Sequence, residues 1–136
     1  MEQTQRYFYR KEHKLKSRKL IQELFEKGKG FSVYPIKVVW LPSNHLANLQ
    51  AGVGVSSRYF KKAVDRNRIK RLMREAYRLQ KAPLQQLLDS NNDLQLSVFF
   101  LYNGKELPNH STIMDKMKVA LTRLEKYCHG DIEKNT

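Results

Sequence analysis

The segment that most restricts the fold of this chain is its most apolar stretch, LQLSVFFLY, at Leu94–Tyr102. A continuous apolar run of this length is typical of a strand in the centre of a sheet. Phe31–Leu41 predicts two short strands, or one bent strand, because Pro35 interrupts it. Ala51–Ser56 predicts another strand. We therefore expect a small sheet with Leu94–Tyr102 at its centre.

Helical spacing of apolar residues predicts three helices beside this sheet. The first covers Ser17–Lys27, the second covers about Asp65–Lys81 and ends before Pro83, and the last begins at a cap formed by Ser111 or Thr112. The order α-β-β-β-α-β-α, with helices covering a small mixed sheet, predicts an α/β sandwich. We expect residues 1–136 to form a single domain, with a flexible basic arm at residues 1–12 and a frayed tail at residues 130–136.

The charge of the chain points to a polyanionic partner. Lys and Arg number 26 against 13 Asp and Glu, which gives a formal net charge of +13. Nucleic acid, an anionic membrane and an acidic protein are the usual acceptors of such a charge. A membrane is the least favoured, because no apolar run approaches the roughly 20 residues that span a bilayer. The absence of an apolar signal segment and the single cysteine, Cys128, indicate a cytoplasmic, reduced protein.

The basic residues concentrate in the second predicted helix and the segment before it. From Arg58 to Lys81 there are ten Lys and Arg residues and two acids, Asp65 and Glu75. A solvated helix face normally mixes both signs, so a face of nearly one sign favours binding to phosphates over simple solvation. At about 100° per residue one arc of roughly 140° contains Arg66, Asn67, Lys70, Arg71, Arg74, Arg78 and Lys81.

The sequence RNRIKRLMREAYR, preceded by GVGVSSRYFKKAVD, resembles the signature region of the protein subunit of bacterial ribonuclease P. HKLKSRKLIQELFEKG resembles the first helix of that family, and the resemblance covers roughly Tyr9 to Tyr127. It implies a four-stranded mixed sheet with a left-handed βαβ crossover, a fold shared with the second domain of a ribosomal protein. It also implies a ribonucleoprotein that removes the 5′ leader of precursor transfer RNA, in which the RNA subunit carries the active site and binds Mg²⁺.

The resemblance implies roles for two sets of residues. A leader-binding cleft would be lined by Ile21 and Phe25 of the first helix and by Val38 and Trp40 of the sheet. The alternative for Val38 and Trp40 is ordinary core packing, because a slip of one residue exchanges the faces of a strand. The implied contacts to ribonuclease P RNA, which also support its metal site, are Arg66, Asn67, Arg68, Lys70, Arg71, Arg74 and Arg78, flanked by Arg58, Lys61 and Lys62.

No catalytic constellation or metal-ligand spacing is visible among the protein's own residues, since its four histidines are scattered. We expect a subunit of the transfer-RNA-processing endoribonuclease that is monomeric apart from its RNA and acts on precursor transfer RNA. Two alternatives stay open. One is a non-enzymatic RNA-binding protein of the ribosomal type, which has no need of a leader cleft. The other is a nuclease made of protein alone.

Overall fold

The computed structural model describes residues 18–42, 49–90 and 95–134. These residues form one four-stranded sheet and the helices that pack on it. Its strands are β1 (Lys29–Val33), β2 (Ile36–Pro42), β3 (Leu49–Val55) and β4 (Leu96–Tyr102), in the spatial order β1-β2-β4-β3. β4 pairs antiparallel with β2 and parallel with β3. The prediction that the apolar segment forms a central strand is therefore confirmed, and so is the mixed sheet.

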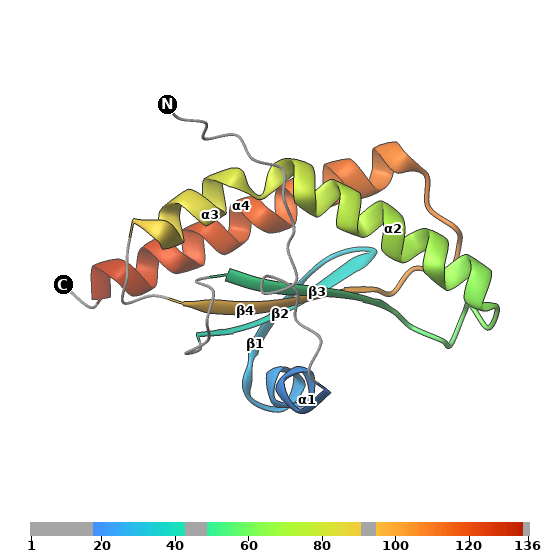
Figure 1. Cartoon of the computed structure of the whole chain (residues 1–136), viewed down its shortest axis with the longest axis horizontal. Coiled ribbons are helices and arrows are strands. Elements are labelled where there is room, and N and C mark those ends of the chain that lie inside the picture. The colour runs from blue at the N-terminus through green and yellow to red at the C-terminus, as the bar shows by residue number, and fades with distance from the viewer. Residues whose placement is uncertain (1–17, 43–48, 91–94, 135–136) are drawn as a thin grey trace.

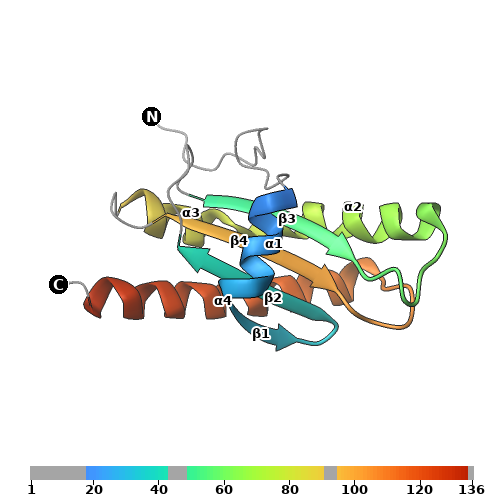
Figure 2. The same ribbon diagram turned by 90° about the horizontal axis from the view of Figure 1, so that it is seen from below.

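Helices cover both faces of the sheet, as Figures 1 and 2 show. α1 (Arg18–Lys27) lies alone on one face. On the other face lie α2 (Ala63–Gln80), α3 (Ala82–Asp89) and α4 (His110–Lys134). The two helices α2 and α3 form the connection between the parallel neighbours β3 and β4. None of the helices in the described ranges is long and apolar enough to cross a membrane.

Alternation along the strands divides the buried side chains between two cores, because successive residues of a strand point to opposite faces. The larger core lies between the sheet and α2, α3 and α4. The smaller core lies under α1 and consists of Leu24, Val39 and Phe99. Strand residues that enter the larger core are Ile36, Val38, Trp40, Leu49, Ala51, Leu96, Val98, Phe100 and Tyr102.

The predicted end of the second helix before Pro83 is confirmed, but a further helix that was not predicted follows it. α2 ends at Gln80, and Ala82–Asp89 form α3. Pro83 lies in the first turn of α3, where a missing backbone N–H costs nothing. The proline therefore begins a second helix here instead of simply ending the first one.

The predicted cap of α4 was also wrong. The Asn109 side-chain oxygen accepts a hydrogen bond of 2.8 Å from the backbone N–H of Thr112. Asparagine caps helices as well as serine or threonine does, and Asn109 comes first along the chain. At its other end α4 continues to Lys134, through most of the segment expected to be a frayed tail. The arm at residues 1–12 and Ser17, the first residue of the predicted helix Ser17–Lys27, lie outside the described residues.

Candidate nucleic-acid interface

α2 is positioned by an apolar stripe that repeats every three to four residues. Ile69, Met73, Ala76 and Tyr77 are buried against the sheet and α4. The ring of Tyr77 lies 5.6 Å from that of Phe100 in β4. Because this stripe fixes the rotation of the helix about its axis, the opposite face of α2 points to solvent.

The outward face of α2 carries most of the predicted basic residues. The predicted separation of one apolar and one basic face is confirmed by burial along the helix. Among the basic residues only Lys70, Arg66 and Arg78 are partly buried. The fully exposed predicted residues on α2 are Asn67, Arg68, Arg71 and Arg74.

Arg66 is held by the protein itself. Its Nη1 donates hydrogen bonds to the carbonyl oxygens of Phe60, at 2.9 Å, and Lys61, at 2.7 Å. These bonds fasten the β3–α2 loop to the first turn of α2. The guanidinium still adds positive charge to this end of the helix, but part of its hydrogen-bonding capacity is already used.

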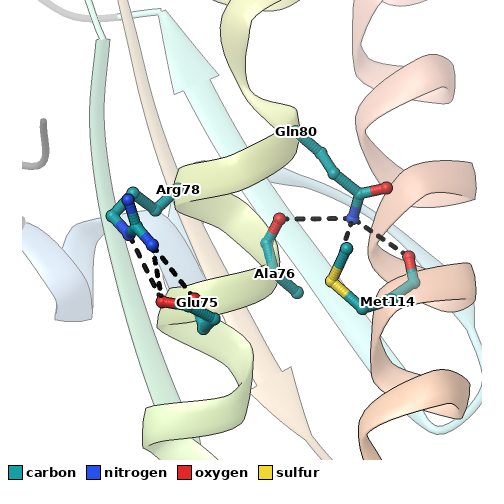
Figure 3. A network of polar contacts seen from close by, with 5 residues as sticks. All are labelled: Glu75, Ala76, Arg78, Gln80 and Met114. Atoms are coloured by element: carbon teal, nitrogen blue, oxygen red, sulfur yellow. Dashed lines mark hydrogen bonds and ion pairs between the residues drawn. The ribbon is translucent and has the colours of Figure 1, made fainter. Parts of the chain in front are cut away.

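Arg78 is neutralised by a neighbour on the same helix. Its Nη2 donates to both carboxylate oxygens of Glu75 at 3.0 Å, and its Nε donates to one of them at 3.3 Å (Figure 3). Two residues after Arg78, the Gln80 side-chain amide donates a hydrogen bond of 3.0 Å to the carbonyl oxygen of Met114 in α4. The C-terminal part of α2 is thus pinned to α4 and carries less net charge than the N-terminal part.

Lys81 does not belong to the basic face, contrary to the helical-wheel prediction. α2 ends before it, and its side chain is only 6% exposed. Burial lowers the pKa of its ammonium group, and the carboxylate of Asp89 partly opposes that shift. The chain turns into α3 at this point, which carries Lys81 inward and away from the row of exposed arginines.

The loop before α2 extends the basic surface. Arg58, Lys61 and Lys62 are all exposed, as their flanking position predicted. Two cations lie near the ring of Tyr59, with Arg58 Cζ at 5.5 Å and Lys105 Nζ at 5.9 Å from its centroid. Lys105 comes from the β4–α4 loop, and sequence reasoning missed it because that loop meets Tyr59 only in the fold.

A second candidate surface lies between α1 and the sheet. Phe25 is exposed on α1, and Ile21 is partly buried beside it in the smaller core. The prediction that Val38 and Trp40 face α1 is wrong. Both are buried in the larger core, on the opposite face of the sheet. The core alternative therefore holds for these two residues.

The β2 residues that face α1 alternate with Val38 and Trp40 along the strand. Their partners in β4 face α1 as well. Val39 is opposite Phe99, and Lys37 is opposite Leu101. Leu41 and Leu101 pack at the margin of the smaller core. Sequence reasoning missed this set, although the exposed charge of Lys37 gives a signal. A lysine at this strand position indicates that its face is the less completely covered one.

Gly54 of β3 leaves room for the ring of Phe99. A Cβ atom built at Gly54 would lie 2.7 Å from Cζ and 3.0 Å from Cε2 of that ring. The ring of Phe99 therefore lies over the backbone of β3, in the space left by the missing side chain. A glycine inside a strand often marks such a close approach.

The described residues contain no group of three or more His, Cys, Asp or Glu side chains that could hold a metal ion. The interface instead offers exposed guanidinium and ammonium groups on one side and aromatic and aliphatic surface on the other. Such groups bind phosphates and stack on bases. The arrangement is suited to binding phosphates and flat rings.

Comparison with known proteins agrees with this chemistry. The ribonuclease P family model matches residues 9–125. The ribonuclease P protein component of Porphyromonas gingivalis is 39% identical over 116 residues, which is 84% of each chain. That of Methylococcus capsulatus is 40% identical over 80 residues, which cover 59% of this chain and 62% of the relative.

Solved structures share the fold. The ribonuclease P protein of Staphylococcus aureus superposes with a TM-score of 0.63 at 18% identity, over 82% of this chain and 94% of that one. The protein from Thermotoga maritima gives a TM-score of 0.57 at 21% identity, over 81% and 96% of the two chains. With the match of the family model over most of its length, this chain belongs to the family of ribonuclease P protein components.

Proposed function

We propose that this chain binds ribonuclease P RNA through the outward face of α2 and the loop before it. The observation that carries the proposal is the row of exposed side chains Arg68, Arg71 and Arg74, which no carboxylate neutralises within the described residues. Planar guanidinium groups bind phosphates in a bidentate way. Asn67, exposed beside them, can donate to or accept from a 2′-hydroxyl group.

The surface between α1 and the sheet supports a second part of the proposal. Phe25 and Leu101 supply an aromatic and aliphatic surface, the buried Phe99 supports the Phe25 ring, and Lys37 supplies an exposed cation beside it. A single-stranded segment binds where bases can stack and phosphates can reach cations. We assign this surface to the 5′ leader of precursor transfer RNA.

In this proposal the RNA subunit performs the cleavage and holds the Mg²⁺ ions that the reaction needs. The protein's residues bind and orient the two RNAs, and they lower phosphate repulsion where the RNAs approach each other. The proposal places the protein in the cytoplasm as a monomer that associates with RNA.

The experiment is cleavage of a precursor transfer RNA with a 5′ leader at low Mg²⁺ concentration. Bacterial ribonuclease P RNA alone, the protein alone and the two together would be compared. We expect rapid cleavage only when both are present. Cleavage by the protein alone would show a protein nuclease, and unaltered cleavage by the RNA despite measurable protein binding would favour a ribosomal-type RNA-binding role.

Binding to the RNA subunit needs its own control. Arg71→Glu reverses a charge in the middle of the exposed row, and Lys19→Glu makes the same change on α1, on the other face of the sheet. We expect Arg71→Glu to weaken RNA binding much more than Lys19→Glu does. Equal effects would mean that net charge, and not the α2 surface, determines binding.

A further inference from the structure

Aromatic rings and cations also lie close together at the β1 edge of the sheet. This edge belongs neither to the outward face of α2 nor to the surface between α1 and the sheet. β1 and β3 are the two edge strands of the sheet. α2 packs against β3, whereas α4 packs against β1 and β2 (Figure 2). We name this region the edge patch, and its residues are Lys29, Phe31, Arg123, Lys126 and Tyr127.

The centre of the edge patch is the ring of Tyr127. It stacks on the buried Trp40, with centroids 5.6 Å apart and an interplanar angle of 27°. Phe31 lies beside it, with centroids 5.5 Å apart. Trp40 is 2% exposed but Tyr127 is 42% exposed. One side of the tyrosine ring covers the tryptophan, so its exposed area is available to another flat group.

The cations of the patch are held close to these rings. Arg123 Cζ lies 4.3 Å from the Phe31 centroid, and its Nη1 donates to the Ser32 carbonyl oxygen at 3.2 Å. Lys29 Nζ lies 5.3 Å from the Trp40 centroid. Lys126 is exposed one turn after Arg123. None of the three forms an ion pair within the described ranges.

The backbone adds polar groups to the patch. β1 pairs with β2 on one side and with no other strand in the described part of the sheet. Gly30 and Ser32 are exposed along it, so small side chains leave the outer edge accessible. Outward N–H and C=O groups of an edge strand, apart from the Ser32 carbonyl oxygen that Arg123 already binds, can bond ribose hydroxyl groups and bases.

We propose that the edge patch binds a short single-stranded segment of RNA, with a base stacked on Tyr127 and phosphates bound by Arg123, Lys29 and Lys126. Cations without acidic partners select a polyanion. Exposed ring surface selects flat bases, and the bases of a duplex are hidden in its stack. A protein partner is less suited, because a stable protein interface has to cover roughly 800 Å² per partner.

The site carries its own reporter, because Trp40 is the only tryptophan of the chain. A uridine decamer would be titrated into the full-length protein while tryptophan emission is recorded. We expect saturable quenching, since a base stacked on the exposed side of Tyr127 changes the environment of the indole that packs on the other side of that ring. A decamer in which one uridine is replaced by 4-thiouridine should crosslink to the peptides containing Phe31 or Tyr127.

Variants separate stacking from charge. Tyr127→Leu should weaken the binding that causes quenching by about tenfold, the cost of one lost stacked base. Lys126→Gln leaves the rings in place and should reduce the log–log salt slope of the same binding by about 0.7. Lys118→Gln, on the same helix but about two turns before Lys126, is the matched control and should change neither value.

Three results would overturn the proposal. The first is decamer binding without a change of Trp40 emission and with crosslinks confined to α2. The second is equal quenching by inorganic polyphosphate, which has charge but no bases. The third is a Lys118→Gln effect as large as that of Lys126→Gln. Because the assay contains neither ribonuclease P RNA nor precursor, its result is independent of the cleavage experiment.

Discussion

The rings of Phe25 in α1 and Phe99 in β4 meet edge to face, with centroids 5.6 Å apart and an interplanar angle of 66°. Phe99 is 8% exposed, whereas Phe25 is 44% exposed. The buried ring therefore fixes the exposed one, and the exposed one is presented to solvent in a defined orientation. A ring that is already immobilised loses little entropy when a base stacks on it.

This pair leads to a prediction about leader binding. Phe25→Ala should weaken binding of a precursor with its leader by about 1–3 kcal/mol, the value of one stacked base. Binding of mature transfer RNA, which lacks the leader, should stay unchanged. Equilibrium titration of both RNAs to the assembled ribonucleoprotein measures the difference. Leu107→Ala, which removes another exposed apolar side chain, is the control. A loss of affinity for both RNAs would contradict the assignment to the leader.

Gly54 makes a second prediction about the same surface. Gly54→Ala places a methyl group against the Phe99 ring, which has to move and to carry its contact with Phe25 along. We expect a loss of about 1–3 kcal/mol in the free energy of unfolding, as for other overpacked sites. Urea denaturation measures it. Gly30→Ala is the comparison, since a Cβ there would lie at 3.4 Å from the Val38 carbonyl oxygen. Equal losses of unfolding free energy in the two variants would mean that the Phe99 ring can move away from a methyl group at position 54 at no cost in stability.

Two arginines of α2 should respond differently to mutation. Arg74 is exposed, so Arg74→Glu should weaken RNA binding and leave the melting temperature nearly unchanged. Arg66→Ala should also lower stability, by about 1–3 kcal/mol, because two loop carbonyl oxygens lose a charged donor. Thermal unfolding and RNA titration together separate the two effects. A large loss of melting temperature in Arg74→Glu would contradict the orientation of the helix.

The salt dependence of RNA binding tests the α2 surface as a whole. If about five phosphates are neutralised, the slope of log affinity against log salt should be near −3.5 to −4.5. The slope is measured by repeating the titration with ribonuclease P RNA at increasing salt. A slope near zero would mean that the exposed arginines do not bind phosphates.

Alkaline pH tests the packing of Tyr102. Burial raises the pKa of its phenol above the usual 10.0, with smaller contributions from Tyr34 and Glu106. Above pH 10 the unfolded chain therefore releases a proton that the folded protein retains, so the stability falls as pH rises through the raised pKa. The hydroxyl also donates to the Glu106 carbonyl oxygen at 2.6 Å. Tyr102→Phe should lose about 1 kcal/mol at neutral pH and show a shallower alkaline decline in denaturation experiments. If the stability of Tyr102→Phe fell with rising pH as steeply as that of the original protein, the alkaline decline would be due to titratable groups other than Tyr102.

The sequence predicted the sheet and the basic helix well because both depend on local patterns. Hydrophobic runs located β4, and the helical period located the buried stripe of α2. The assignment of sheet faces failed because it depends on register. Val38 and Val39 are equally suited to a strand, and only the pairing of β2 with β4 decides which of them meets α1.

The sequence also overcounted the free cations of α2. Arg66 and Arg78 have the same helical spacing as their exposed neighbours, but they bind groups that the period does not reveal. One partner is a pair of loop carbonyl oxygens, and the other is Glu75 on the border of the face. A helical wheel gives the direction of a side chain and not what it meets there.

The small size of the core under α1 affects how easily this helix can leave the sheet. Among the residues that the structure describes, only Leu24, Val39 and Phe99 are buried in it, whereas the other face of the sheet is covered by three helices. Loss of α1 from the sheet should therefore require much less free energy than global unfolding, and its amides should exchange with deuterium sooner than those of β4. If the leader binds beside α1 as proposed, a surface bounded by a loosely attached helix can change its width and so fit single strands of different base composition.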